Sequence, residues 1–273
     1  MRLVLPKGSL ESATLDLFEA ADLRVRRSSS VTYRAEIDDP RIAEVRILRP
    51  QEIPRYVAEG LFDFGITGRD WVEETASEVV SLGELHYSKV STDPVRIVLA
   101  VPDSSDVRSV EDLPSGVRVS SEYPELTRRF FAARGIEADV RLSYGATEAK
   151  VPDIVDAIVD TLLTSWTELI ANPTSAADPA KRHAMGQILT LLQGVLDART
   201  KVLVKLNVPA DRLDAVVALL PSMKSPTVNQ LHGGTGFAVE SVVAKSTINV
   251  LIPALSDAGA SDIIELSIAK IVP

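Results

Sequence analysis

Short apolar runs alternate with helix-like stretches through the first two thirds of the chain. Arg2–Leu5, Glu44–Leu48 and Phe62–Thr67 have the length and apolar content of buried strands. Apolar residues at helical spacing follow Ser9, whose hydroxyl is expected to cap a helix, and Pro50–Glu59 is expected to form the next helix. Strands that alternate with helices are typical of an α/β fold, so we expect a mostly parallel sheet.

The same alternation continues beyond residue 94. Val95–Val101 and Asp139–Tyr144 predict further strands, and Leu126–Ala133 lies between them with the pattern of a helix. Asn172–Pro179 is rich in small and turn-forming residues and is predicted to be a linker. Ala180–Arg199 follows it and predicts a helix that leads into the last part of the chain.

The chain after residue 200 follows a different order, strand–helix–strand–strand–helix–strand. Its predicted strands are Lys201–Val208, Ser225–Leu231, Phe237–Ala244 and Asp262–Val272, the last with Ile264, Leu266 and Ile268 in alternation. Its predicted helices are Ala210–Leu220 and Thr247–Ala258, the second closed by Gly259, and its predicted turn is Gly233–Gly236. This order is the ferredoxin-like βαββαβ arrangement, so we expect a small independent module.

Composition and charge narrow the class of protein. The 273 residues are 45% hydrophobic and 25% charged, the balance of a soluble protein of about two domains. The net charge of -9 argues against a protein that binds nucleic acid through its phosphates. The absence of cysteine excludes disulfides, cysteine-ligated zinc and thiol catalysis. No apolar run is long enough to span a membrane, so we expect a cytoplasmic protein without nucleic-acid or membrane partners.

Glycine-containing turns lie at three strand-to-helix junctions: Lys7–Ser9, Gly65–Asp70 and Gly145–Glu148. A glycine there lets an anion approach the backbone, and the helix N-terminus attracts phosphate. Lys7 adds a positive charge, and the second turn suits a ribose or nucleotide contact. Taken singly, Lys7–Ser9 is better explained as an ordinary structural turn, because such turns occur in every α/β fold, and Gly65–Asp70 is explained equally well by either role.

Carboxylates surround the apolar run that ends near residue 160. They are Asp153, Asp156 and Asp160, and this region could supply the one or two carboxylates that magnesium on a pyrophosphate needs. Asp153 is better explained as part of a solvated helix face. The three histidines have no metal-ligand spacing, and each is expected to be structural or exposed.

Four segments occur in a characteristic order: Met1–Leu10, Leu48–Pro50, Phe62–Asp70 and Ser143–Asp153. Together they resemble the ATP phosphoribosyltransferases over nearly the whole chain, and the last module resembles the regulatory domain of the long form of that family. The resemblance implies the first step of histidine biosynthesis, in which N1 of the ATP adenine attacks C1 of 5-phosphoribosyl 1-pyrophosphate (PRPP) and pyrophosphate leaves. It also implies Mg²⁺ as cofactor, feedback inhibition by histidine, and a homo-oligomer between dimer and hexamer.

The resemblance assigns roles to individual residues and to parts of the chain. The expected catalytic residues are Lys7, Arg49 and Glu148. The residues expected to line ATP are Asp70, Tyr123 and Arg128. The expected Mg²⁺ ligands are Glu148 and Asp160, and PRPP is expected to bind Asp160 and Lys7. The expected histidine pocket is lined by Asn207, Met223, Ser225 and Thr227, although the family often has Asp where Asn207 stands.

The resemblance also implies a two-lobed body of the periplasmic-binding-protein kind, followed by an ACT-like regulatory domain. The expected bounds are 1–93 with 161–198 for the first lobe, 94–160 for the second lobe and 199–273 for the regulatory domain.

One part of the family pattern is missing. The resemblance predicts a glycine-containing loop and a short helix after Asp160, which hold the 5′-phosphate of PRPP. Here Ile158–Asp160 runs directly into Thr161–Ala171, and no glycine lies between Gly145 and Gly186. The gap is roughly 15–20 residues, the size of such a loop and helix. Either the loop is deleted, which predicts severely impaired PRPP binding, or a segment of that size is missing from this sequence and the protein is an ordinary histidine-regulated transferase. The alternative function is therefore a non-catalytic nucleotide- or histidine-binding paralogue, or an inactive loop-deleted variant.

Overall fold

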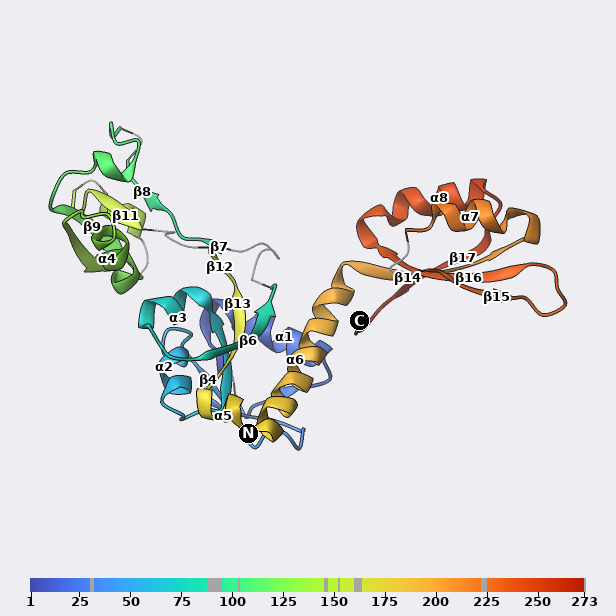
Figure 1. Ribbon diagram of the computed structural model, residues 1–273, viewed down its shortest axis with the longest axis horizontal. Coiled ribbons are helices and arrows are strands. Elements are labelled where there is room, and N and C mark those ends of the chain that lie inside the picture. The colour runs from blue at the N-terminus through green and yellow to red at the C-terminus, as the bar shows by residue number, and fades with distance from the viewer. Residues whose placement is uncertain are drawn as a thin grey trace. The chain divides into compact units, whose positions relative to one another are not determined.

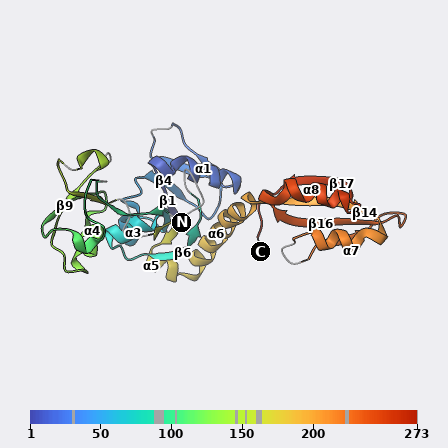
Figure 2. The same cartoon turned by 90° about the horizontal axis from the view of Figure 1, so that it is seen from above.

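The computed structural model describes residues 1–29, 32–87, 95–102, 104–144, 147–151, 153–159, 164–221 and 225–272, with only the backbone of Val95, Thr147, Glu148 and Val159. The chain divides into two units, Met1–Leu189 and Thr190–Pro273, which follow one another along the coloured ribbon (Figures 1 and 2). Each unit contains its own sheet and its own apolar cluster.

A seven-stranded sheet forms the centre of the first unit. Its order is β2 (Val25–Arg26), β3 (Arg34–Ile37), β4 (Glu44–Leu48), β1 (Arg2–Pro6), β5 (Phe64–Gly68), β13 (Thr167–Ala171) and β6 (Val80–Leu85). β1 pairs in parallel with β4 and β5. Only β3 and β13 run against both of their neighbours, so the other five strands of this sheet share one direction.

Among its described residues, the first unit contains five α-helices besides Pro124–Ala132. They are α1 (Glu11–Ala20), α2 (Ile53–Ala58), α3 (Arg69–Thr75), α5 (Pro173–Ala177) and α6 (Pro179–Arg199). Of these, α1, α2 and α6 lie where the sequence pattern predicts helices. Ile53 and Val57 of α2 and Val72 of α3 join Val4 and Ile170 of the sheet in one apolar cluster. The burial of such side chains is the main force that holds the helices against the strands.

The predicted helix cap at Ser9 is wrong. Ser9 lies inside a 3₁₀ turn at Gly8–Leu10, and α1 starts after Leu10 without a side-chain cap. Backbone hydrogen bonds of the 3₁₀ turn pair polar groups at the start of the helix, so a capping hydroxyl is not needed there.

The predicted linker at Asn172–Pro179 is also wrong, because most of it forms α5. Asn172 caps this helix: its Oδ1 accepts a hydrogen bond from the Ser175 backbone N–H at 3.1 Å. Ser175 and Ala176 are buried, so the small residues that suggested a linker serve close packing instead.

A second sheet, of four strands, lies elsewhere in the first unit. Its order is β10 (Ala138–Leu142), β9 (Val117–Ser121), β11 (Ala157–Val159) and β8 (Leu99–Ala100). The first three strands are parallel and β8 is antiparallel, while α4 (Pro124–Ala132) packs Phe131 against Val119 and Val140. The strand predicted at Val95–Val101 is broken into β7 (Val95–Arg96) and β8. β7 pairs with β12 (Thr164–Ser165) where the chain passes between the two sheets (Figure 1).

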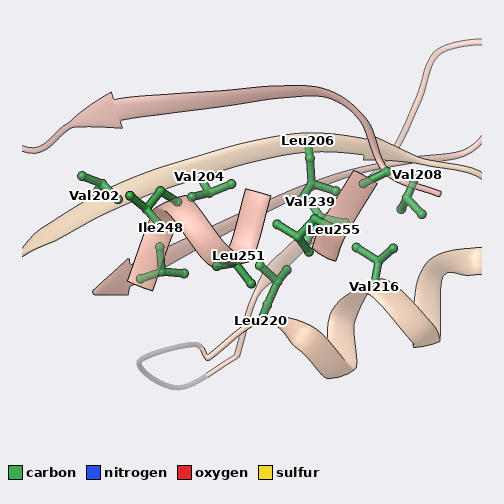
Figure 3. Close-up of a cluster of buried hydrophobic side chains, with 12 residues drawn as sticks. Val202, Val204, Leu206, Val208, Val216, Leu220, Val239, Ile248, Leu251 and Leu255 are labelled. Atoms are coloured by element: carbon green, nitrogen blue, oxygen red, sulfur yellow. The ribbon is translucent and has the colours of Figure 1, made fainter. Parts of the chain in front are cut away.

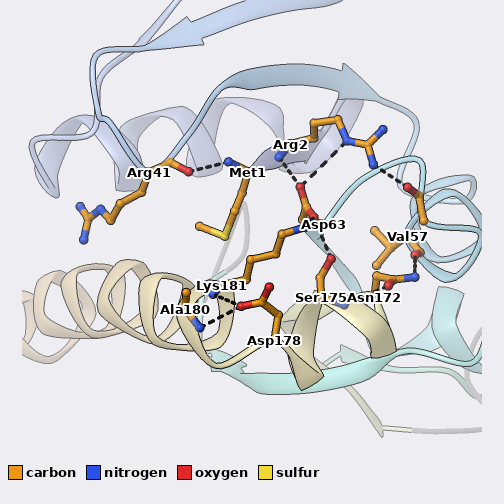
Figure 4. Close-up of polar contacts among 11 residues, drawn as sticks. Met1, Arg2, Arg41, Val57, Asp63, Asn172, Ser175, Asp178, Ala180 and Lys181 are labelled. Carbon is orange, nitrogen blue, oxygen red and sulfur yellow. Dashed lines mark hydrogen bonds and ion pairs between the residues drawn. The ribbon is translucent and has the colours of Figure 1, made fainter.

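Asp63 joins four elements at the edge of the large sheet where β1 and β5 begin (Figure 4). Its Oδ2 accepts the Arg2 backbone N–H at 2.6 Å, and its Oδ1 accepts Ser175 Oγ at 2.7 Å and Lys181 Nζ at 2.6 Å. Burial alone would raise the pKa of Asp63, but the hydrogen bonds from Lys181, Arg2 and Ser175 outweigh it and lower the pKa to about 2.

The second unit has the predicted βαββαβ order. Its elements are β14 (Lys201–Val208), α7 (Leu213–Leu219), β15 (Thr227–Gln230), β16 (Phe237–Ala244), α8 (Ile248–Asp257) and β17 (Ser261–Ser267). The sheet order is β15-β16-β14-β17, antiparallel throughout. Alternate residues of β14 pack against α7 and α8 in the core of Figure 3, which is why the period of two in the sequence predicts this strand correctly.

The last strand is shorter than predicted and presents its apolar residues away from the helices. β17 ends at Ser267, and Ile264 and Leu266 are 51% and 42% exposed. Ile263, on the opposite face of the strand, packs against the core. The alternation therefore predicts the strand but not which face is buried.

The fold class predicted from sequence is confirmed: an α/β body with two largely parallel sheets and a C-terminal ferredoxin-like module. Within the described part of the chain, none of the helices combines the length and the apolar character that crossing a bilayer requires.

Candidate active site

Two cations lie at one edge of the large sheet. Lys7 follows β1 and Arg49 follows β4, and these strands are parallel neighbours whose ends are joined by the Lys7 N–H, which donates to the Leu48 carbonyl at 2.7 Å. The Lys7 ammonium lies 4.2 Å from the centre of the Tyr33 ring, and the Arg49 side chain is exposed. Ligands of open α/β sheets bind at the carboxyl ends of the strands, which is where both cations stand.

Gly8 opens the space beside Lys7. Its φ is +87°, a left-handed conformation that favours glycine, and no atom lies within 4 Å of the position a Cβ would take. The turn after β1 therefore leaves its backbone accessible, as a phosphate contact requires.

Asp70 is buried at the start of α3, one strand further along the same edge. Its Oδ1 accepts Ser165 Oγ at 2.6 Å, its Oδ2 accepts the Tyr123 hydroxyl at 2.6 Å, and its backbone N–H donates to Ser165 Oγ at 3.1 Å. A Cβ at Gly68 would lie 2.0 Å from Asp70 Oδ1, so this carboxylate can occupy its position only beside a glycine. Both oxygens are thus held in a fixed orientation.

Tyr123 belongs to a contact between α3 and α4. Its ring lies 4.5 Å from that of Trp71 at a tilt of 38°. The Glu74 carboxylate accepts the backbone N–H groups of Glu125 at 3.0 Å and Leu126 at 2.8 Å, in the first turn of α4. An anion at a helix N-terminus satisfies otherwise unpaired donors, so Glu74 fixes α4 beside Asp70.

The Arg128 side chain on α4 already forms an ion pair and a hydrogen bond within its own part of the fold. Its Nη1 donates to Glu125 Oε1 at 2.5 Å and its Nη2 to the Val140 carbonyl at 3.2 Å, with half of the side chain exposed. The structure therefore joins Asp70 with Tyr123 directly, and it holds the Arg128 guanidinium against its own sheet.

Glu168 is a buried carboxylate that sequence reasoning missed. It is 3% exposed on β13, where Trp166 Nε1 donates to its Oε1 at 2.8 Å and Arg69 Nη1 lies 3.9 Å from its Oε2. Burial raises the pKa of Glu168, and the charge of Arg69 and the Trp166 hydrogen bond oppose that rise only in part. Its position inside the apolar run Thr167–Ala171 is the feature of the sequence that could have indicated a buried carboxylate.

Ser165 was missed as well, although it makes two hydrogen bonds to Asp70. It lies on β12, which belongs to neither main sheet, and nothing in the sequence marks a lone serine as the partner of a residue 95 positions away.

Three predicted site residues lie outside what the structure describes. Asp160 and Met223 are outside the described residues, and only the backbone of Glu148 is described, in a 3₁₀ turn at Thr147–Lys150. Among the residues whose side chains are described, no group of three His, Asp or Glu could hold a metal ion. The predicted Mg²⁺ ligands therefore remain a prediction.

The remaining predicted histidine-pocket residues lie in the second unit. Asn207 on β14 and Thr227 on β15 project from the sheet face opposite the helices, separated by β16. Asn207 Nδ2 donates to Asp262 Oδ2 at 3.0 Å, and Ser225 is exposed just before β15. The structure places Asn207 and Thr227 on one surface without joining them.

Comparison with solved structures supports the fold. An ATP phosphoribosyl transferase (HisG:HisZ) complex from Thermotoga maritima matches with a TM-score of 0.60 and 22% identity, over 72% of this chain and 98% of that chain.

Relatives with known names cover the chain from end to end. A protein named ATP phosphoribosyltransferase from Desulforudis audaxviator (strain MP104C) is 45% identical, over 100% of this chain and 99% of its own length. One from Pelotomaculum thermopropionicum is 44% identical over the same shares. The first alignment extends over 292 positions against 273 residues here, so about 19 of its positions have no counterpart in this chain. That number agrees with the size of the gap predicted from the sequence.

Two family models match consecutive parts of the chain. The model described as ATP phosphoribosyltransferase matches residues 49–172, which include Arg49, Asp70 and Tyr123. The model of the HisG C-terminal domain matches residues 198–270, the ferredoxin-like unit. With full-length relatives at 45% identity, these matches show that the chain belongs to the ATP phosphoribosyltransferase family.

Proposed function

We propose that this protein transfers a phosphoribosyl group from PRPP to N1 of the ATP adenine and releases pyrophosphate. The observation that carries the proposal is the full-length relationship to proteins of that name, at 45% identity. The two cations and the buried Asp70 at one edge of the large sheet supply chemistry that suits it.

The reaction requires little covalent chemistry from the protein. Charge develops on the ribose as C1 loses pyrophosphate and gains the adenine nitrogen, so positioning and electrostatic stabilisation dominate. In the proposal, Lys7 and Arg49 neutralise phosphate oxygens, and Lys7 approaches PRPP beside the open backbone of Gly8.

Asp70, Tyr123 and Arg128 are proposed to line the ATP side. The Asp70 carboxylate accepts hydrogen bonds in a fixed orientation set by Ser165 and Tyr123, and a fixed acceptor suits the exocyclic amino group of adenine. Arg128 would have to exchange its ion pair with Glu125 for a phosphate, which costs little because both side chains are about half exposed.

Members of this family work on a pyrophosphate substrate, which carries a divalent cation, and we propose Mg²⁺. Mg²⁺ keeps waters and takes one or two protein carboxylates together with substrate phosphates. Glu148 and Asp160 provide the hard oxygen ligands that this ion prefers. When bound, the ion would neutralise the departing pyrophosphate.

The ferredoxin-like unit is proposed to bind histidine as a feedback inhibitor through Asn207, Met223, Ser225 and Thr227. We propose the bounds 1–93 with 161–198 and 94–160 for the two catalytic lobes, and 199–273 for the regulatory domain. The protein is proposed to act as a homo-oligomer between dimer and hexamer.

The experiment mixes protein, ATP, PRPP and Mg²⁺ and measures pyrophosphate release with and without histidine. We expect release that histidine suppresses, with a high KM for PRPP because about 19 positions of the relatives are missing here. Arg49→Gln should raise the KM further, whereas Arg24→Gln, at an exposed ion pair with Glu19, should not. Ligand binding without any pyrophosphate release would instead support a non-catalytic binding protein.

A further inference from the structure

An arginine-lined hollow lies on the β2–β3–β4 part of the large sheet. Its volume is 770 Å³. The charged residues that line it are Arg26, Arg27, Arg34, Arg46, Glu36 and Glu44. Neither Lys7 nor Arg49 is among its lining residues, so the hollow is separate from the proposed substrate cations. A surface with four arginines contrasts with the net charge of -9 of the chain.

Two of these arginines face each other across the strands. Arg34 of β3 and Arg46 of β4 are direct partners in the antiparallel register. Directly opposed side chains of a sheet have Cβ atoms about 5 Å apart, and like charges there are destabilising. Glu44 pairs with Arg46 at 2.5 Å, but Arg34 has no ion pair among the described residues. An anion between the two guanidinium groups would convert this repulsion into attraction.

Arg27 adds a third donor with unused capacity. Its side chain is 19% exposed and its Nη2 pairs with Glu11 at 2.6 Å. Its Nη1 is buried and has no hydrogen-bond partner in the described part of the protein. A buried donor without a partner is costly, so an acceptor oxygen that reached it would relieve that cost.

Two carboxylates lie further along the hollow, where Glu36 is the direct cross-strand partner of Arg26 on β2. Glu36 lies two residues beyond Arg34 on β3, and Glu44 two residues before Arg46 on β4. Because these strands are antiparallel, Glu36 and Glu44 lie opposite each other about 7 Å along the backbone from the arginine pair, although the Glu44 carboxylate reaches back to Arg46 at 2.5 Å. Carboxylates accept hydrogen bonds from hydroxyl groups but repel phosphate. The hollow therefore favours a ligand whose phosphate lies at Arg34 and whose hydroxyl groups lie near Glu36.

We propose that this hollow is a second binding site, for a sugar phosphate or the ribose phosphate part of a nucleotide. The phosphate lies between Arg34 and Arg46 within reach of Arg27, and a hydroxyl group binds Glu36. The site is independent of the proposed phosphoribosyl transfer, because no residue assigned to that reaction lines it.

The test is calorimetric titration of the whole protein with ribose 5-phosphate, compared with inorganic phosphate and with ribose. Arg34→Gln removes the arginine without an ion pair, Arg49→Gln alters only the proposed substrate site, and Arg24→Gln is the surface control. We expect Arg34→Gln to weaken ribose 5-phosphate binding at least tenfold, while Arg49→Gln and Arg24→Gln retain binding. Pyrophosphate release by Arg34→Gln should be unchanged. Glu36→Gln should weaken ribose 5-phosphate but not inorganic phosphate.

A stability measurement separates this role from a structural one. In phosphate-free buffer, Arg34→Gln should match or exceed the melting temperature of the original protein, because it removes a repulsion. Ribose 5-phosphate should raise the melting temperature of the original protein but not that of the variant. The proposal is overturned if Arg49→Gln abolishes binding while Arg34→Gln keeps it, if no titration shows binding, or if phosphate binds as tightly as ribose 5-phosphate. A changed oligomeric state of Arg34→Gln would overturn it too, because the surface would then be an interface between copies.

Discussion

Asp63→Asn tests how far one buried carboxylate stabilises the first unit. The wild-type side chain is 6% exposed and accepts hydrogen bonds from the Arg2 backbone of β1, from Ser175 of α5 and from Lys181 of α6. Asparagine keeps the size but replaces one acceptor oxygen by an NH₂ group and leaves Lys181 without its partner charge. We expect the variant to fold but to be clearly less stable.

The magnitude follows from the pKa. The pKa of Asp63 falls from 3.8 to about 2 in the folded protein. At 1.36 kcal/mol per unit this corresponds to about 2.5 kcal/mol. Because the folded pKa is the lower one, the contribution is complete above pH 4 and is lost as the pH falls through 2, with about half remaining at pH 3. With a urea dependence of about 2 kcal/mol per molar, the midpoint at pH 7 should fall by about 1 M.

The assay is urea unfolding followed by tryptophan fluorescence between pH 7 and pH 3. The chain has two tryptophans, Trp71 and Trp166, and both lie in the first unit, so the signal reports on the part that contains Asp63. Asp16→Asn, at an exposed position of α1, is the matched control and should leave the midpoint unchanged. Equal midpoints for Asp63→Asn and wild type at pH 7, or a difference that stays constant down to pH 3, would refute the reasoning.

Three further substitutions test the candidate site. Tyr123→Phe removes the donor to Asp70 but keeps the aromatic ring, so the KM for ATP should rise about tenfold, and an unchanged KM would contradict the proposed role. Glu74→Gln weakens the anionic cap of α4 and should cost about 1 kcal/mol, seen as a melting temperature lowered by about 2–4 °C; no shift would mean that water replaces the cap. Glu168→Gln should raise the urea midpoint at pH 7, because the pKa of Glu168 is raised in the folded state and its ionisation opposes folding. This gain should disappear near pH 4, and a destabilised variant at pH 7 would show that the charge is required.

Three strands with regular alternation were predictable to the residue, whereas the alternation of Ile264, Leu266 and Ile268 did not give the bounds of β17. The bounds of β4, β14 and β16 match the expected strands, because one face of each is buried along its whole length or nearly so. Asn172–Pro179 was mispredicted because proline, serine and alanine suit both a linker and the first turns of a tightly packed helix, and only burial distinguishes the two.

The sequence predicted which turns carry the candidate site residues, but it did not predict the hydrogen bonds between those residues. Lys7, Arg49 and Asp70 stand where strands end, and the order of strands brings such ends to one edge. The hydrogen bonds of Asp70 to Tyr123 and Ser165 join residues 53 and 95 positions apart. Local periodicity carries no information about such pairs, because they depend on how the two sheets meet.

The helix α6 belongs to both units, and we expect it to couple their unfolding. It runs without interruption through Pro179–Arg199, whereas the boundary between the units falls at Leu189. Met185 and Ile188 are buried in its first half and Leu192 and Val195 in its second. A short helix is marginal without burial, so melting either unit leaves the other with a frayed helix end. Calorimetry should therefore record one broad, coupled transition rather than two independent peaks, and cleavage after Leu189 should lower the heat stability of both fragments.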